Sequence, residues 1–178
     1  FQEAMYWLLS GCGIGFRIFQ KDVNNYKNIN IRDKGVKTFT IEDSIEGWSD
    51  AIGVLISSYL SKEYNVTFPE FQEYRIDFDY SKIRKKGSLI TGGFKAPGPN
   101  GLRKAILKIE DIFNNRLELG FIRTLDVYDT IMHMANAVLS GGVRRSASIC
   151  LFHKDDDLLL NAKTGDWYEN NKQRARSN

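Results

Sequence analysis

The sequence predicts an α/β fold in which a largely parallel sheet is covered by helices. Segments with the periodicity of strands alternate with segments that have the periodicity of helices along the 178 residues, which is the pattern of parallel sheets with crossover helices. The chain is 42% hydrophobic and 26% charged, as expected for a globular domain rather than a disordered segment. The length is that of one ordinary domain, and we find no internal repeat.

Predicted strands carry apolar residues at every second position, which places those residues on one face of a sheet. In chain order this alternation occurs at residues 16–19, near Ile29 and Ile31, and at residues 36–40, 74–80 and 146–152. The last of these is rich in apolar residues, so we expect a buried strand that places Cys150 inside. Residues 21–34 and 61–73 are mainly polar, and we expect a loop and an excursion there.

Predicted helices carry apolar residues three or four positions apart and begin at a residue that can cap the first turn. The first helix is expected to cover residues 1–10, and the second is expected to start at Asp43 or Ser44 and to end near Leu60. Four further helices are expected to start, in chain order, at Pro99 or Asn100, at Thr124 or Asp126, at residues 155–157 and at Asp166. The helix that starts near Thr124 is expected to stop at residues 140–142, where glycine favours the end of a helix.

The composition argues against several classes of protein. No apolar run approaches the roughly 18 residues that a membrane span needs, and the 2 Cys residues, Cys12 and Cys150, cannot form a disulfide framework. The 2 Cys and 2 His are scattered, so the usual four-ligand zinc site is not expected. A net charge of +3 is low for a nucleic-acid binder but is compatible with a ligand that carries phosphate. We therefore expect a cytoplasmic protein with no metal, membrane or nucleic-acid partner.

The two ends of the sequence suggest a segment of a longer protein. The chain begins with Phe1 in the middle of a helical pattern, without a capping residue or the charged start of a signal peptide. Residues 170–178 look like the end of a helix that leads into something further.

Three glycine-rich turns are the candidates for function, because glycine lets a backbone approach a ligand and its N–H groups can hold phosphate. The first contains Ser10, Gly11, Gly13 and Gly15. It superficially resembles the dinucleotide-binding fingerprint, but that motif follows a strand and opens a helix, whereas a helix precedes this turn and a strand follows it. A tight helix-to-strand turn without a ligand is the alternative.

The second turn contains Gly92, Gly93, Lys95 and Gly98, and residues 84–86 add further basic groups that could hold a phosphate. Its alternative is a solvated basic loop. The third turn runs through Gly141, Gly142, Val143, Arg144, Arg145 and Ser146. Arginine recognises phosphate or a base edge with two parallel hydrogen bonds, and the alternative is a glycine pair that ends a helix beside exposed arginines.

Other polar residues are weaker candidates. We expect His133 to pack on or near a helix surface and His153 to end a strand, neither of them as a catalyst. The acidic residues 155–157 are better explained by the start of a helix than by a metal site. Cys12 lies in a glycine turn, but no partner base makes it a nucleophile.

Four stretches, in the same order as in the family, resemble the large catalytic chain of ribonucleotide reductases. They are Leu9-Ser-Gly-Cys-Gly-Ile-Gly-Phe16, Glu42-Asp-Ser-Ile-Glu-Gly-Trp48, the run from Phe78-Asp-Tyr-Ser to Gly92-Gly-Phe-Lys-Ala-Pro-Gly-Pro99, and Gly141-Gly-Val-Arg-Arg-Ser-Ala147. The closest similarity is to the adenosylcobalamin-dependent class in its monomeric ribonucleoside-triphosphate reductase form. The diiron and glycyl-radical classes share the fold.

The resemblance implies roughly the first half of a ten-stranded α/β barrel, so that residues 1–178 would be a partial catalytic barrel domain truncated at both ends. The implied reaction converts ribonucleotides, as triphosphates, to deoxyribonucleotides by thiyl-radical chemistry. Its implied partners are adenosylcobalamin, bound mostly outside this segment, a deoxynucleotide effector, a thioredoxin-like reductant and the remainder of the reductase chain. The residues themselves leave diphosphate and triphosphate substrates open.

The resemblance also implies roles for the three turns. Ser10, Gly11, Gly13 and Gly15 would line the substrate pocket. The effector and specificity loops would contain Gly92, Gly93, Lys95, Gly141, Gly142, Val143, Arg144, Arg145 and Ser146, with Arg144 or Arg145 making the decisive contact. Pro97 stands where many members have Ser, a departure from the pattern of the second loop.

No catalytic residue is assigned, because the family's radical cysteine would lie beyond Asn178 and its first redox cysteine before Phe1. The chain alone is therefore expected to be inactive. Two rival readings remain: a non-enzymatic nucleotide-binding module that stands alone, and a nucleic-acid binder that uses residues 84–86, Lys95, Arg144 and Arg145.

Overall fold

The strands form two separate parallel pairs. The structure, a computed structural model, describes residues 1–26, 28–89, 95–139 and 147–178. Within these ranges β1 (Ile14–Ile18) pairs with β4 (Ser148–Phe152), and β2 (Val36–Thr40) pairs with β3 (Arg75–Asp79). The parallel pairing confirms the α/β prediction, but the expectation of one sheet is wrong for the described residues. The physical reason is that helices fill the space between the two pairs.

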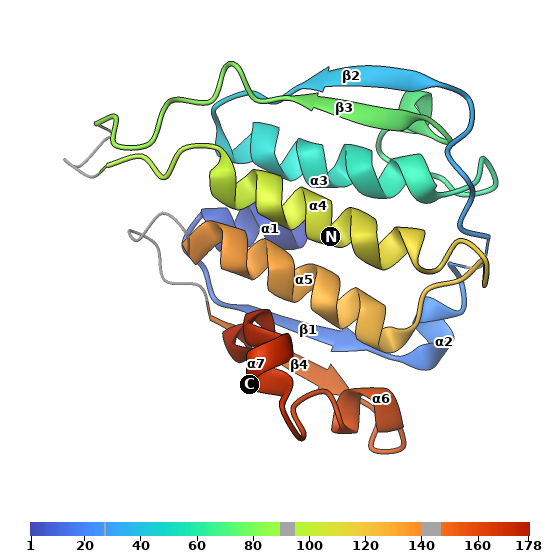
Figure 1. Cartoon of the computed structure of the whole chain (residues 1–178). Helices are drawn as coiled ribbons and strands as arrows, with labels where there is room; N and C mark the ends of the chain where they lie inside the picture. Colours follow the sequence, from blue (N-terminus) through green and yellow to red (C-terminus); the bar gives the residue numbers. More distant parts are fainter. Residues whose placement is uncertain (27, 90–94, 140–146) are drawn as a thin grey trace.

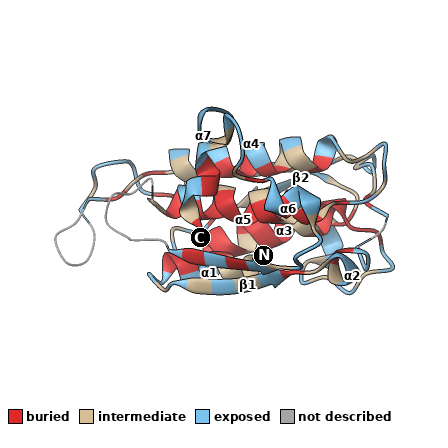
Figure 2. Ribbon diagram, turned by 90° about the horizontal axis from the view of Figure 1, so that it is seen from below, coloured by how far each residue is buried: buried red, intermediate tan, exposed pale blue. Residues whose placement is uncertain are grey.

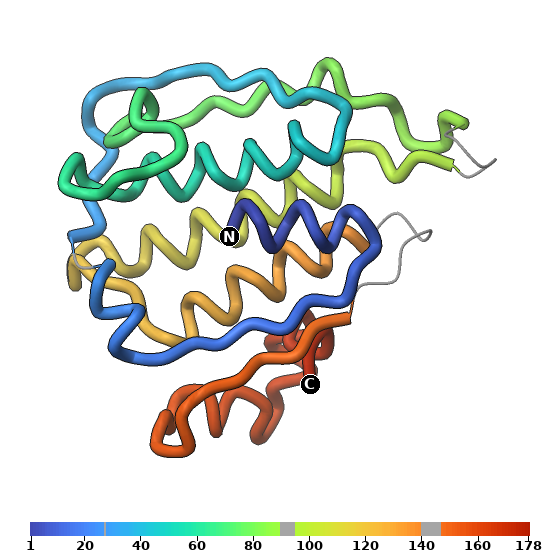
Figure 3. The backbone as a smooth tube through the Cα atoms, turned by 180° about the vertical axis from the view of Figure 1, so that it is seen from behind, coloured from blue at the N-terminus to red at the C-terminus, as the bar shows by residue number. Residues whose placement is uncertain are grey.

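A layer of helices separates the two strand pairs (Figure 1). It consists of α1 (Gln2–Leu9), α3 (Ile45–Tyr59), α4 (Asn100–Asn114) and α5 (Thr124–Leu139). α3 packs against β3 and α1, while α1 and α5 contact β1. Seen from behind, α1 lies between α3 and β1 (Figure 3). The two pairs run in opposite directions, with β2 and β3 ending on the side where β1 and β4 begin (Figure 1).

The core lies where these helices face one another, and Figure 2 shows their buried residues in red. Its largest fully buried side chains include Tyr59, Phe113, Met5 and Met132, which come from four different helices. The buried positions of α4 are Leu102, Ala105, Ile106, Ile109 and Phe113. This three-and-four spacing is the one that predicted the helix.

The predicted starts of the long helices are confirmed. Ser44 caps α3, since its side chain accepts a hydrogen bond from the Gly47 N–H at 2.9 Å. Asp43, the alternative cap, forms an ion pair with Arg84 instead. α5 begins at Thr124 and ends at Leu139. Its predicted stop at residues 140–142 lies outside the described residues.

Several local expectations were wrong. The predicted loop at 21–34 contains part of α2 (Gln20–Val23), which is too short to show helical periodicity. Near Ile29 the described residues form an isolated bridge to Leu60 in place of the expected strand. The strand β4 is buried on one face only, because Ile149 and Leu151 are 49% and 58% exposed while Cys150 is buried as expected.

Short elements complete the chain. The excursion at 61–73 contains the 3-10 turn η1 (Pro69–Phe71), and α6 (Asp157–Leu160) follows β4. The helix expected from Asp166 onward is a short α7 (Trp167–Asn170) followed by the 3-10 turn η2 (Lys172–Arg176). Among the described residues, no helix has the length and apolar character to cross a membrane.

Candidate nucleotide-binding end of the fold

The described flanks of the three glycine-rich turns lie at one end of the fold (Figure 1). The turn at residues 10–13 leads into β1, residues 95–98 lead into α4, and Ala147 leads into β4. We call residues 10–13, 84–89, 95–98 and 147 the glycine end. The strands β1 and β4 begin at this end and β2 and β3 finish at it, so loops from both pairs converge there.

The end of helix α1 explains Gly11. Its φ of +84° belongs to the left-handed region, which favours glycine. The Gly11 N–H donates to Leu8 O and the Cys12 N–H donates to Trp7 O, each at 3.0 Å, which is the Schellman pattern of a helix C-terminus. The Ser10 hydroxyl donates to Tyr6 O at 2.9 Å. In this structure, therefore, Ser10 and Gly11 shape the turn.

Gly13 and Gly15 are exposed and contribute no side chains to the outer face of the β1–β4 pair. The Ile14 N–H between them donates to Ala147 O at 3.0 Å, which ties the turn to the start of β4. A Cβ at Gly15 would meet Ile149 Cγ2 at 3.4 Å, in ordinary contact. These two glycines therefore offer a surface on which a ligand can approach the backbone. That they bind substrate stays a prediction.

Lys95 lies on a short arm formed by two antiparallel segments. The Gly87 N–H donates to Ala96 O at 2.9 Å, and the Ala96 N–H donates to Ser88 O at 2.7 Å. Leu89 bridges Lys95 within this arm, and the Lys95 side chain is exposed. Gly92 and Gly93 lie outside the described residues, as do Gly141, Gly142, Val143, Arg144, Arg145 and Ser146.

Ion pairs fix the base of the arm on the rest of the fold. Arg84 pairs with Asp43 just before α3, and Lys82 pairs with Glu42. The partners are far apart in sequence, so no local pattern could have predicted the pairing. Arg84, one of the basic residues that the sequence suggested as phosphate ligands, is thus already paired with a carboxylate.

A cleft of about 540 Å³ lies beside the ends of β2 and β3 and the start of α4. Its lining includes Thr38, Asp77, Ser81 and Arg103. The Arg103 guanidinium lies 4.3 Å from the centre of the Tyr80 ring, and burial raises the pKa of Tyr80 to about 12. Sequence reasoning missed Arg103, whose only signal was its place in the first turn of a helix that follows a glycine-rich loop.

Comparisons with known proteins decide the family. No family model matches the chain. An adenosylcobalamin-dependent ribonucleoside-triphosphate reductase of Lactobacillus delbrueckii subsp. bulgaricus is 31% identical over 138 residues, which are 77% of this chain and 18% of the relative. That of Lactobacillus leichmannii is 30% identical over the same shares. The chain is homologous to a segment of the class II ribonucleotide reductases.

A solved structure agrees with this assignment at the level of the fold. A crystal structure of a B-12-dependent, class II ribonucleotide reductase matches 99% of this chain with a TM-score of 0.83 and 22% identity. The match covers 28% of that chain, and our chain spans only 18% of the length of the two reductases above. The chain therefore corresponds to a minor part of each of these reductases.

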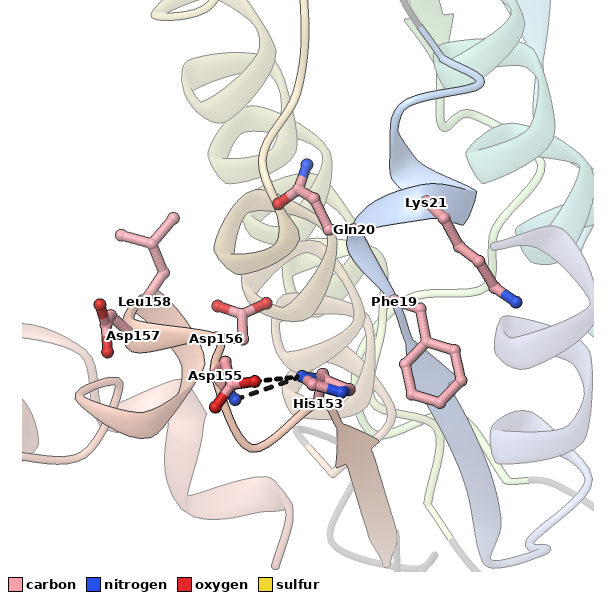
Figure 4. A pocket seen from close by; sticks show the side chains of 8 residues that line it. All are labelled: Phe19, Gln20, Lys21, His153, Asp155, Asp156, Asp157 and Leu158. Carbon is pink, nitrogen blue, oxygen red and sulfur yellow. Dashed lines mark hydrogen bonds and ion pairs between the residues drawn. The ribbon is translucent and has the colours of Figure 1, made fainter.

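The cleft beside His153 does not fit adenosylcobalamin. His153 lines a cleft of about 560 Å³ beside Phe19, Asp155, Asp156 and Asp157, and its Nδ1 accepts a hydrogen bond from the Asp155 N–H at 3.3 Å (Figure 4). A corrin ring is larger and mainly apolar, with neutral amide arms, so a small cleft with three carboxylates does not suit it. No step proposed for this class II segment passes through the cofactor.

The acidic residues 155–157 begin a helix, as predicted. Asp156 Oδ1 accepts from the Leu159 N–H at 3.1 Å and caps α6. No group of three potential metal ligands occurs in the part of the chain that the structure describes. His133 is half-buried in α5, and burial lowers its pKa, while His153 follows the last residue of β4, as predicted.

Cys150 does not have the surroundings of a reactive thiol. Cys150 is buried on the inner face of β4, and burial raises the pKa of its thiol to about 11. Cys12 is partly buried behind the Schellman turn. A thiol is reactive mainly as the thiolate, so the environment of Cys150 opposes such chemistry.

Proposed function

We propose that this chain is the substrate- and effector-binding segment of an adenosylcobalamin-dependent ribonucleotide reductase, which converts ribonucleoside triphosphates to deoxyribonucleotides by thiyl-radical chemistry. One observation carries the proposal: the chain is 31% identical to a ribonucleoside-triphosphate reductase over 77% of its length. The convergence of its three glycine-rich turns at one end of the fold supports it. In the complete enzyme this segment would form part of a ten-stranded α/β barrel.

The two kinds of ligand would occupy different parts of the glycine end. The ribonucleotide substrate would lie over Gly13 and Gly15, while Ser10 and Gly11 hold the turn. The deoxynucleotide effector would contact the loops that contain Gly92, Gly93, Lys95 and residues 141–146. Arg144 or Arg145 would sense the effector and help to select the substrate base, because arginine can recognise both phosphate and base edges.

The remainder of the reductase chain would supply the groups that this segment lacks. The radical cysteine, the redox cysteines and the adenosylcobalamin site would lie there, and a thioredoxin-like protein would reduce the enzyme in the cytoplasm. The high pKa of the Cys150 thiol supports the assignment of catalysis to cysteines elsewhere. The segment alone would be inactive.

The rival functions have weaker support. A nucleic-acid interface would need an unpaired basic surface, but Arg84 and Lys82 are ion-paired with Asp43 and Glu42. A stand-alone nucleotide-binding module would bind nucleotide without any partner, and no described feature favours it over the reductase.

The test uses a complete reductase that carries this segment, with Arg144→Ala and Arg145→Ala variants. We expect at least one of them to disturb the matching between effector and substrate while the Tm is kept. The matched control is Arg75→Ala, because Arg75 is exposed at the start of β3, away from the glycine end. If both loop variants select substrates as the unaltered enzyme does, the proposed role of this loop is wrong. If the complete protein reduces no ribonucleotide, the proposed activity is wrong.

A further inference from the structure

The last two residues form a short, strand-like segment that pairs with β4 through an isolated bridge. The Asn178 N–H donates to Ser148 O at 3.0 Å, and the Cys150 N–H donates to the main-chain oxygen of Asn178 at 3.1 Å. Ser177 and Ser148 form a parallel bridge. The β1–β4 pair is therefore extended by Ser177 and Asn178, at the end where β4 begins and where the glycine turns converge.

Side chains of three other elements hold this short strand in place. The Tyr128 hydroxyl lies 2.7 Å from Ser177 Oγ, and Lys163 donates to Ser177 O. Just before it, Arg174 forms two hydrogen bonds with the Asp129 carboxylate, at 2.7 and 2.6 Å. Both members of this pair are nearly buried, so the strand is fixed on α5 rather than lying loosely on the surface.

Strand alternation decides which way Asn178 faces. Ser177 is extended, with φ −133° and ψ 157°, and its side chain is buried against α5. The next side chain must point to the opposite face of the sheet. The hydrogen bonds of Asn178 to Ser148 and Cys150 set it level with Ile149, which is itself paired with Gly15. Gly15, Ile149 and Asn178 thus lie side by side on the outer face.

Around Gly13 and Gly15 this outer face has an open backbone, with the neutral side chain of Asn178 level with Gly15 and the exposed Arg17 two residues further along β1. Gly13 and Gly15 contribute no side chain, and Ala147 and Ile149 contribute only apolar groups. Asn178 is exposed, and its carboxamide offers both a donor and an acceptor. A neutral amide suits a ribose hydroxyl or a base edge, whereas phosphate is better matched by arginine or lysine.

We propose that the Asn178 carboxamide is a further substrate-binding group, which hydrogen-bonds to the ribose or base of a ribonucleotide that lies over Gly13 and Gly15. The proposal rests on the proposed substrate site at the glycine end and deepens it. Ser177, Tyr128 and Arg174 act through Asn178 as positioning residues, because they set the strand on which it stands.

The experiment uses the 178-residue chain labelled with nitrogen-15 and titrated with CTP, and separately with inorganic tripolyphosphate. In NMR spectra we expect the Asn178 side-chain NH₂ signals and the Gly13 and Gly15 amide signals to shift over the same range of CTP concentration. Asn178→Ala should weaken CTP binding about fivefold, the usual worth of one lost hydrogen bond, and leave tripolyphosphate binding unchanged. Asn178→Asp, which keeps the shape but removes the donor, should also weaken CTP binding.

The control is Asn170→Ala, since Asn170 is also an exposed asparagine but ends α7, which is not part of the β1–β4 pair. It should bind CTP as the unaltered chain does, and all variants should keep the Tm. Unchanged CTP binding by both Asn178 variants overturns this inference and leaves the proposed substrate site standing. If the unaltered chain does not bind CTP at all, the proposed substrate site fails, and this inference fails with it.

Discussion

The two ends of the molecule differ in the residues that form them: glycine-rich turns form one end, and paired charged side chains form the other. The glycine end consists of turns that include left-handed glycines, among them Gly11 and Gly98, whose φ values are +84° and +70°. The opposite end, where α4 finishes and α5 starts, is held by buried or half-buried charges. We call Arg32, Glu110, Arg116, Arg123 and Asp126 the charged end.

The charged groups of the charged end are paired with one another by hydrogen bonds, and the Arg32–Glu110 pair joins segments 78 residues apart. Asp126 accepts hydrogen bonds from Arg116 and Arg123 side chains at 2.8 to 3.1 Å and from the Arg123 N–H at 2.8 Å. Arg32 pairs with Glu110 at 2.9 Å and lies 4.0 Å from the centre of the Tyr59 ring. This end closes the fold, so the other end can present loops and bare backbone to a ligand. The following predictions test that division between scaffold and site.

The largest effect is expected from Asp126→Ala. Its carboxylate is 7% exposed and its two arginine partners are 19% and 33% exposed, so the change leaves two guanidinium groups without their partner. The free energy of unfolding should fall by about 3 kcal/mol, as measured by urea denaturation. Lys108→Ala is the control, because it removes an ion pair with Asp111 that is more than half exposed and should cost less than about 1 kcal/mol. Equal losses in the two variants would contradict the scaffold role of the charged end.

At the glycine end, Gly98→Ala should cost about 2 kcal/mol, from a left-handed backbone and from crowding. A Cβ there would lie 2.8 Å from Lys86 N. Gly87→Ala is the matched control, since Gly87 has φ +90° but nothing within 4 Å of the added Cβ. It should cost about 1 kcal/mol, the backbone part alone. Thermal or urea unfolding of both variants separates the cost of the left-handed backbone from the cost of crowding against Lys86. Equal losses of unfolding free energy in the two variants would show that the contact with Lys86 is unimportant.

Acid should weaken the charged end through Asp126. Burial opposes ionisation of this carboxyl, but hydrogen bonds from Arg123 and Arg116 outweigh burial, so the pKa of Asp126 lies below its ordinary value. Its stabilisation is therefore complete above the unfolded pKa, about 3.9, and is lost as the pH falls through the lower, folded pKa. Urea unfolding from pH 6 downward should show the difference in stability between the unaltered chain and Asp126→Asn shrinking below about pH 4. A constant difference would exclude this titration.

What the sequence could predict was local. The observed starts of helices α3, α4 and α5 agree with the predicted ones, because amphipathic spacing and capping depend only on residues that are close in sequence. The four-residue α2 has no such periodicity and was missed. The apolar residues of β4 suggested burial, but Ile149 and Leu151 face outward, and the facing of a strand depends on what covers the sheet.

The site was predictable only in part for the same reason. Glycine and basic residues marked the three turns, and the structure brings their described flanks together. The pairing of Asp43 with Arg84 and the position of Asn178 beside Ile149 depend on contacts between distant segments. The spacing of residues within one segment does not predict contacts between distant segments. These contacts can therefore be identified only from the folded structure.

The smallest effect on stability is expected for a substitution at Gly15. This substitution distinguishes a role in ligand binding from a role in folding. Gly15 has no left-handed backbone, and a Cβ would meet only Ile149 Cγ2 at 3.4 Å, so Gly15→Ala should change the free energy of unfolding by less than about 0.5 kcal/mol. If a nucleotide approaches this backbone closely, the added methyl group must still weaken binding. We expect CTP affinity to fall severalfold at an unchanged Tm, measured by titration calorimetry. Val36→Ala, on the exposed outer face of the other strand pair, should leave CTP affinity unchanged. A Gly15→Ala chain that binds CTP normally would mean that the bare backbone of β1 is a folding feature and not a ligand surface.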